Sequence, residues 1–119
     1  MAAALSLAAW AQQPPPAEPP EEDEALAPKE YAFNPIQAQK EMQVGNYYFK
    51  KGSFRAAAGR FEEAARWDPN NAEAYLRAGE SYEKLKDWKA MRAAYEKYLQ
   101  LAADGKDAAR VRKSLAAKR

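Results

Sequence analysis

The chain has 119 residues, of which 47% are hydrophobic and 30% charged, which suffices for one modest domain with a packed core. It contains no cysteine and no histidine, which excludes disulfides, thiolate and imidazole chemistry and the usual zinc ligands. Its mean hydropathy of -0.78 argues against a membrane-embedded protein. The charge is divided unevenly: residues 1–30 carry a net −5 and residues 31–119 a net +7.

The first segment with a recognisable pattern is a run over residues 2–11 that has no charged residue and is apolar except for Ser6. It is too short for a membrane span, which needs about 20 residues, but it fits the apolar region of a secretory signal. Ala9 and Ala11 provide a small-x-small cleavage site, with Gln12 as the mature start. We therefore predict a signal peptide over residues 1–11. No lysine or arginine precedes the run, so an alanine-rich unstructured end remains the alternative.

This prediction implies a location in the periplasm or cell envelope. No cysteine follows the run, so a lipoprotein anchor is not expected. Residues 12–30 hold six of the eight prolines and all six acidic residues of the leader. Such a composition cannot bury enough surface to fold alone, so residues 12–33 are predicted to be a disordered, partly polyproline linker. The acidic leader could also fold back on the basic domain as an internal competitor.

Helical signals begin at Asn34, an N-cap candidate that is followed by Pro35 and has Gln37 in the capping-box position. We expect a first helix over residues 35–51, ended by Gly52 in the left-handed conformation. Ser53 can cap a second helix that ends near residue 67.

Residues 68–71, Asp-Pro-Asn-Asn, interrupt the helical pattern, and Asn70 with Glu73 can form the next capping box. A third helix should end near residue 85, and Asp87 should cap a fourth that ends near residue 101. After a turn at residues 104–105, Asp107 can start a fifth helix over residues 107–119. No stretch alternates as a strand would, so the predicted fold class is all-α.

The helices carry an internal repeat, because four pairs of like residues are separated by 34 positions. The pairs are Ala38 and Ala72, Gly45 and Gly79, Tyr48 and Tyr82, and Phe61 and Tyr95. With this period over paired helices, residues 38–105 resemble the tetratricopeptide-repeat (TPR) family. The resemblance implies an α-solenoid of two hairpins, repeat 1 at 38–71 and repeat 2 at 72–105. We interpret Gly45 and Ala57 as the closest crossing of the first hairpin, with Phe61 filling the volume beside it.

The fifth helix places four apolar residues along one stripe and has a basic opposite face. The stripe comprises Ala108, Val111, Leu115 and Ala116. This pattern is typical of a terminal capping helix, so residues 34–119 are predicted to form the whole domain. Two repeats and a cap are few for a stable solenoid, so self-association is a further hypothesis.

The resemblance also implies a site, since the first helices of TPR hairpins line a concave groove that receives peptides or helices. By position, the groove residues here are Gln39, Met42, Asn46, Phe49, Lys50, Glu73, Leu76, Glu80, Glu83 and Lys84. Met42, Phe49 and Leu76 are expected to be exposed apolar contacts for a protein ligand. The alternative is that Phe49 packs under Tyr31 or Phe33.

One TPR subtype clamps a terminal carboxylate with lysines and asparagines. Here Asn46 is in place, but Met42 stands where a lysine would be expected, and Glu80 and Glu83 would repel an acidic peptide. Binding of chaperone tails is therefore not predicted. The tyrosine-rich hairpins bear a loose likeness to exported bacterial outer-membrane assembly factors.

We predict a non-catalytic adaptor that binds a protein or peptide partner, with no cofactor, no metal and no small-molecule substrate. The pairs Glu62–Glu63 and Glu80–Glu83 lie at helical spacing among bases and favour surface ion pairs over acid–base catalysis. The alternative function is that the basic domain binds an anionic surface, either a membrane or nucleic acid. Export would argue against nucleic acid and leave peripheral proximity to a membrane.

Overall fold

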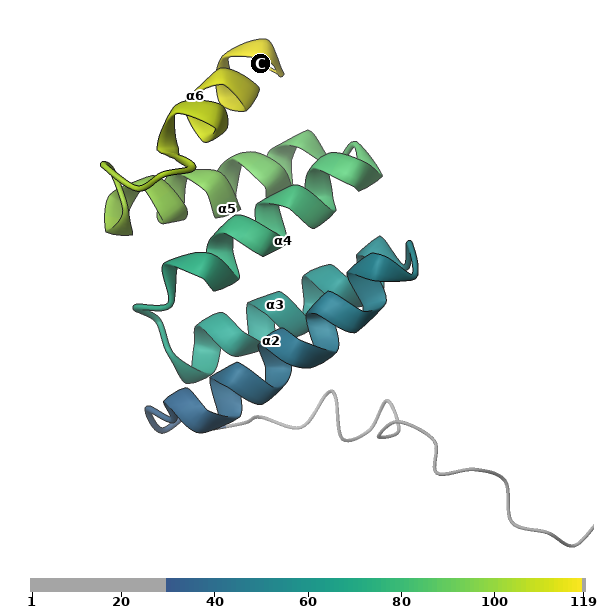
Figure 1. Ribbon diagram of the computed structural model, residues 1–119, viewed down its shortest axis with the longest axis vertical. Helices are drawn as coiled ribbons and strands as arrows, with labels where there is room; N and C mark the ends of the chain where they lie inside the picture. The colour runs from purple at the N-terminus through teal and green to yellow at the C-terminus, as the bar shows by residue number, and fades with distance from the viewer. Residues whose placement is uncertain (1–29, 119) are drawn as a thin grey trace, which may run out of the picture. The chain divides into compact units, whose positions relative to one another are not determined.

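The computed structural model of the protein describes residues 30–118, and its helices form one compact unit (Figure 1). The signal-peptide prediction and most of the linker prediction lie outside the described residues. The helices are α2 (Pro35–Lys50), α3 (Phe54–Trp67), α4 (Ala72–Leu85), α5 (Trp88–Leu101) and α6 (Ala108–Ala117). Residues 30–118 contain no strand, which confirms the all-α class. None of these helices is long and apolar enough to span a membrane.

The helices stack in chain order, with α2 against α3, α3 against α4, α4 against α5 and α5 against α6. Figure 1 shows α2 and α3 side by side at one end of the stack and α6 at the other. This succession of antiparallel pairs, each covered by the next helix, is the predicted helical-repeat solenoid.

The start of α2 follows only half of the predicted capping box. The side chain of Asn34 accepts a hydrogen bond from the Gln37 backbone N–H at 3.0 Å, as predicted. The Gln37 side chain does not reach back, however, and donates instead to Glu41 at 3.3 Å. The Asn34 N–H donates to the backbone carbonyl of Trp67 at 2.9 Å, which joins the start of α2 to the end of α3.

The predicted cap of α4 is wrong by one residue. Asn71, not Asn70, is the N-cap, and its side chain accepts from the Ala74 N–H at 3.2 Å. Asn70 is held in the preceding turn, because its N–H donates to the Asp68 carboxylate at 3.1 Å.

The other three cap predictions differ in outcome. Ser53 directly precedes α3, but its side chain makes no cap hydrogen bond. Asp87 caps α5 as predicted, by accepting from the Ala90 N–H at 3.2 Å. Asp107 makes no side-chain cap bond at α6, because its carboxylate contacts Arg110 instead.

Two turns use the left-handed backbone conformation. Gly52 adopts it at φ +79°, as predicted for a glycine that ends a helix. Lys86 ends α4 with φ 59° although it carries a side chain. Left-handed backbone costs a non-glycine residue about 1–2 kcal/mol, so the second hairpin contains a local strain that the first lacks.

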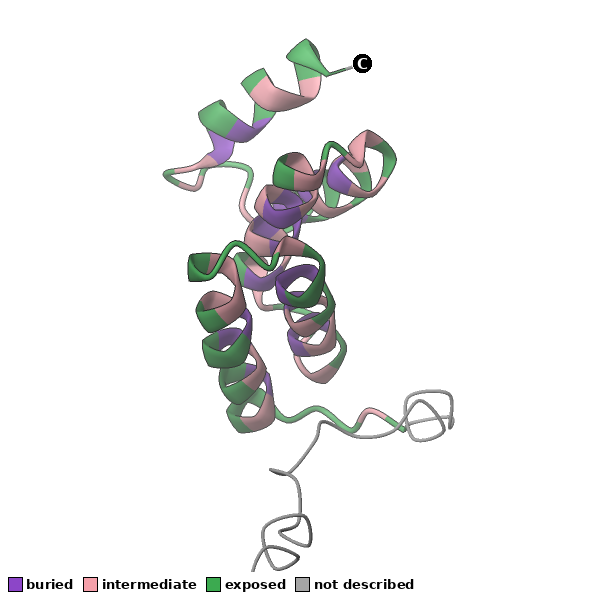
Figure 2. Cartoon of the chain, turned by 90° about the vertical axis from the view of Figure 1, so that its right-hand side faces the viewer, coloured by how far each residue is buried: buried purple, intermediate pink, exposed green. Residues whose placement is uncertain are grey.

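The core consists of two clusters, one centred on the first hairpin and one on the second, and Figure 2 shows the buried positions on the inward sides of the helices. In the first cluster the fully buried ring of Phe61 fills the space that Gly45 leaves. In the second cluster Met91 and Tyr98 are buried, and Tyr98 shares the cluster with Ala108 and Val111 of α6.

The last helix, α6, covers the second hairpin with part of its predicted stripe. Ala108 and Val111 are buried and Leu115 packs beside them. Ala116 is exposed, because it lies two turns beyond Ala108 and about 80° further round the helix. The capping stripe is therefore three residues long.

Candidate binding face

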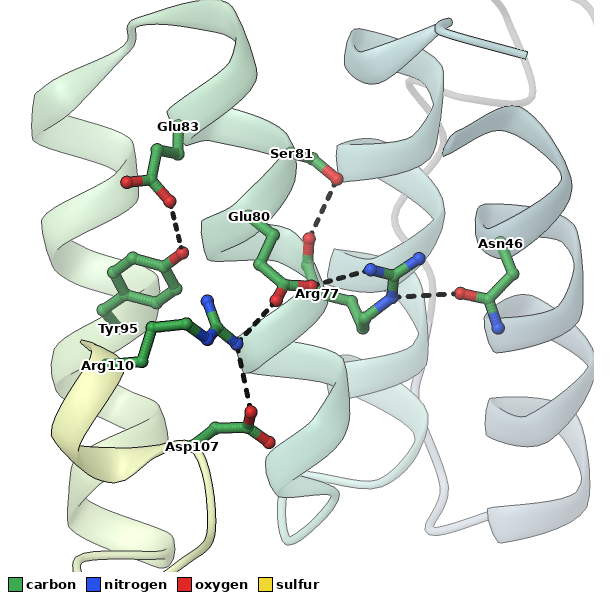
Figure 3. Close-up of polar contacts among 8 residues, drawn as sticks. All are labelled: Asn46, Arg77, Glu80, Ser81, Glu83, Tyr95, Asp107 and Arg110. Atoms are coloured by element: carbon green, nitrogen blue, oxygen red, sulfur yellow. Dashed lines mark hydrogen bonds and ion pairs between the residues drawn. The ribbon is translucent and has the colours of Figure 1, made fainter. Parts of the chain in front are cut away.

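Polar side chains of α2, α4 and α6 form a continuous chain of contacts on one side of the stack (Figure 3). At its centre Arg77 donates from Nε to the Asn46 side-chain oxygen at 3.1 Å and from Nη1 to Glu80 at 2.7 Å. The other oxygen of Glu80 accepts from Arg110 at 2.8 Å, and Arg110 also contacts Asp107 at 3.2 Å. We name these five residues the polar ladder.

Aromatic rings support the central guanidinium. The Arg77 guanidinium carbon lies 4.2 Å from the centroid of the Phe49 ring and 5.4 Å from that of Phe61. Phe49 is itself held edge-on by Phe54 at a centroid distance of 5.1 Å. Stacking fixes the plane of the guanidinium, so its donors point in set directions.

The alternative placement of Phe49 under the incoming chain is wrong. Tyr31 packs edge-on against Trp67 at a centroid distance of 4.9 Å, and its hydroxyl donates to Glu63 at 2.8 Å. Phe33 is 67% exposed, so neither of the two residues expected to cover Phe49 does so.

The ladder is neutral and partly buried. It holds two guanidinium groups and two carboxylates, and the Arg77 and Glu80 side chains are only 23% and 19% exposed. The Arg77–Glu80 contact is therefore less screened than a surface pair, whereas the Arg110 side chain is 46% exposed. The Arg77 carbonyl accepts from the hydroxyl of Ser81, which is fully buried, at 2.9 Å. This bond joins the backbone of Arg77 to a buried residue one turn further along the same helix.

Two tyrosines hold carboxylates, Tyr95 beside the ladder and Tyr82 on the opposite side of α4. The Tyr95 hydroxyl donates to Glu83 at 2.9 Å, and the Tyr82 hydroxyl donates to Glu62. Burial raises the pKa of Tyr95, and the hydrogen bond to Glu83 raises it further. The pKa of Tyr82 is raised in the same way, by burial and then by Glu62. Glu83, predicted to line a groove, is thus bonded to α5.

The structure brings together three of the ten predicted groove residues, namely Asn46, Phe49 and Glu80. Four more are exposed and make no hydrogen bond or ion pair within residues 30–118; these are Gln39, Lys50, Glu73 and Lys84. Arg77 and Arg110 were not among the predicted groove residues. Arg77 had a usable signal, because it lies one turn before Glu80 and therefore on the same side of its helix.

The expectation that Met42 and Leu76 are exposed is wrong, since they are 2% and 7% exposed. Met42 shares a helical stripe with Ala38 and Gly45, which the core covers. Leu76 lies in one cluster with Val111, so α6 covers it. Neither side chain can contact a ligand while the domain stays folded.

The paired carboxylates of the sequence have structural partners. Glu62 accepts from Tyr82, and Glu63 accepts from Tyr31 and contacts Arg66 at 3.1 Å. No group of three or more potential metal-ligating side chains occurs in the part of the chain that the structure describes.

Comparison with known proteins agrees with the helical pairs. Residues 45–86, from the middle of α2 to the end of α4, match the family model for the TPR repeat. Over these residues the stacked helical pairs are similar to TPR repeats. A 56-residue segment is also 39% identical to Stress-induced-phosphoprotein 1 of Caenorhabditis elegans. That match covers 47% of this chain and 18% of the relative, so the chain spans less than a fifth of that protein.

TPR repeats generally mediate protein–protein interactions and are generally non-catalytic modules. The match supports the TPR resemblance of the sequence, and neither comparison names an outer-membrane assembly factor.

Proposed function

We propose that this protein is a non-catalytic adaptor that binds a peptide or helix of a partner protein through the polar ladder. The observation that carries the proposal is Arg77, stacked on Phe49 and held between Asn46 of α2 and Glu80 of α4. We define the ladder face as the polar ladder together with Phe49 and the four exposed residues beside it, Gln39, Lys50, Glu73 and Lys84.

The fixed donors of Arg77 suit a peptide ligand. Within residues 30–118 its Nη2 makes no hydrogen bond, so one arm of the guanidinium fork is available. A guanidinium arm bonds to carboxylate or peptide carbonyl oxygens, and a group that is already held in place loses little freedom when it binds. The neutral ladder does not favour a strongly acidic or strongly basic segment.

Photo-crosslinking in the native cell tests this proposal. A photoreactive residue is placed at Gln39, seven residues before Asn46 on α2, or at Lys84, four residues after Glu80 on α4. Because these spacings are close to whole helical turns, each position lies within about 40° of its ladder residue around the helix. Both positions should crosslink to the same partner. Glu96, an exposed residue of α5, is the matched control and should not. Crosslinks from Glu96 alone would refute the ladder face.

We further propose that the partner is met in the periplasm or cell envelope. The support is the apolar run over residues 2–11 with its small-x-small site before Gln12. Terminal sequencing of the protein from its native cell should then yield Gln12. A mature chain that still begins at Met1 would remove the support for export.

Binding of an anionic surface by the basic domain receives less support, because several basic side chains in and after α6 already contact other parts of the domain. Arg110 belongs to the ladder, Arg112 donates to the Ala103 carbonyl at 2.8 Å, and Lys118 lies 5.0 Å from the Trp88 ring centroid. Affinity for anionic vesicles or duplex DNA that falls steeply with salt would favour this alternative.

A further inference from the structure

A groove lies apart from the ladder face, lined by residues of α3, α4 and α5 and by the Asp87 cap, with a volume of about 600 Å³. No ladder residue lines it. On α4, Tyr75 and Ala78 line the groove, whereas Arg77 and Glu80, each two positions further on, belong to the ladder. Two residues along a helix are about 200° apart, so α4 presents the two surfaces on nearly opposite sides.

The groove is hollow because its walls are built from the smallest side chains. Six alanines line it: Ala65, Ala74, Ala78, Ala90, Ala93 and Ala94. Ala74 and Ala78 are buried at its floor, while Ala93 is exposed at its edge. Small side chains allow another helix to approach to an axial distance near the lower end of the usual 8–10 Å.

The charges at the groove leave two lysines unpaired. Its two carboxylates, Glu62 and Asp87, keep their charge and accept from neutral donors, the Tyr82 hydroxyl and the Ala90 N–H. Its arginine, Arg66, pairs with Glu63, and the charged residues of the lining sum to a net +1. Lys89 and Lys97 have no partner within residues 30–118. They stand two turns apart on α5, about 12 Å along its axis, with Ala93 midway between them.

We propose that this alanine groove is a second docking site, which takes an amphipathic helix of a partner protein whose acidic flank faces Lys89 and Lys97. The lining favours a helix over an extended segment, because the walls are helices whose backbone groups are already bonded. An extended peptide would leave its own N–H and C=O groups unsatisfied there, whereas a helix satisfies them internally. Two unpaired lysines two turns apart select carboxylates at the same spacing.

The groove shares no residue with the ladder face, so the two sites can be tested separately. If both are occupied, one chain holds two partners at once.

Two synthetic helical peptides test the site on the full chain. Both carry the same alanine and leucine stripe, and one has glutamates and the other lysines along the flank. Measured by fluorescence anisotropy, the glutamate peptide should bind at least about tenfold more tightly, and the difference should shrink with salt. Equal affinity of the two peptides would overturn the proposal.

Charge reversal in the protein locates the effect. Lys89→Glu with Lys97→Glu should invert the preference between the two peptides. Lys106→Glu with Lys113→Glu is the matched control, since both lysines are exposed and lie outside the groove. This control makes the same charge change and should leave the glutamate peptide preferred. If both double variants invert the preference, the effect is one of net charge and the groove is not the site.

Filling the groove provides a test that does not depend on charge. Ala93→Gln should weaken the glutamate peptide about tenfold, whereas Ala56→Gln, an exposed alanine of α3 outside the groove, should not change its affinity. Circular dichroism verifies that both variants fold. If sedimentation shows a dimer that Ala93→Gln dissociates, the occupant is a second copy and the partner-helix proposal is wrong.

Discussion

The ring of Tyr95 lies directly against Gly79, so that a methyl group on this glycine would come within 2.3 Å of two ring carbons. Phe61 stands in the same relation to Gly45, with a nearest ring carbon at 2.5 Å. Each ring follows its glycine by 16 residues, and the two pairs are 34 residues apart. The period of the sequence is therefore repeated as a contact between an aromatic ring and a helix backbone.

Gly79→Ala should destabilise the domain by about 1–3 kcal/mol, because the added methyl group overlaps a fully buried ring. The clash outweighs the gain of about 1 kcal/mol in helix propensity. Urea unfolding followed by circular dichroism measures the change. Gly59→Ala is the control: its added methyl group meets nothing within 4 Å, so it should stabilise the domain by about 0.5–1 kcal/mol. Equal shifts for both variants would contradict the ring contact.

Lys86→Gly should stabilise the domain by about 0.5–1 kcal/mol, because glycine adopts the left-handed conformation of this turn without steric cost. Gly52→Ala in the equivalent turn of the first hairpin should have the opposite sign. Thermal melts of the two variants measure both effects. A destabilised Lys86→Gly variant would show that the lysine side chain adds more to the free energy of unfolding than the left-handed backbone takes from it.

Alkaline pH should destabilise the fold through Tyr82 and Tyr95. Their pKa values are raised in the folded state, so the folded chain keeps these protons when the unfolded chain, with a tyrosine pKa near 10, releases them. The stabilisation is complete below about pH 10 and is lost as the pH rises above it, by up to about 1.4 kcal/mol per pH unit for each tyrosine.

Urea unfolding between about pH 9 and pH 11 measures this loss. Tyr82→Phe with Tyr95→Phe should flatten the pH dependence, although each substitution also removes a hydrogen bond and lowers stability at neutral pH. A double variant with an unchanged alkaline slope would show that other groups cause it.

Arg77→Ala should cost about 1–2 kcal/mol, because it removes two charge-assisted hydrogen bonds and the stacking on Phe49. Arg66→Ala is the comparison, since its contact with Glu63 involves a side chain that is 54% exposed. That exposed contact should contribute less than about 0.5 kcal/mol. If denaturant unfolding shows the two variants to be equally stable, the ladder does not stabilise the stack.

Met42→Glu with Leu76→Glu should unfold the domain, because both substitutions place a carboxylate in the core. The loss of helical circular dichroism measures it. Gln43→Glu, at an exposed position of α2, should leave the signal unchanged. A folded double variant would mean that the two side chains are not core residues.

The helices and their order follow from local signals in the sequence. Gly52, Asp87 and the Asp-Pro-Asn-Asn break place helix ends within about a residue of those observed, because caps and turns depend on neighbouring residues alone. The cap that was misplaced by one residue, Asn70 for Asn71, also has a local origin. Both residues can cap a helix, and the Asp68 side chain decides between them.

The binding face was less predictable, because it depends on contacts between distant helices. Leu76 is buried in a cluster that includes residues of α6, about 30 residues further along the chain. Arg110 reaches Glu80 across the same interval. The period of 34 residues indicates equivalent positions in successive repeats, but it does not indicate which of them pair across the stack.

The junction at Trp67 bears on how the domain would respond to tension. Tyr31 packs on the Trp67 ring, and the Asn34 N–H is bonded to the Trp67 carbonyl, so the entering chain is attached to the end of α3 before α2 begins. A pull on the preceding segment would first be borne by that junction and shared by both helices of the first hairpin. Unravelling of α2 turn by turn would require the junction to yield first.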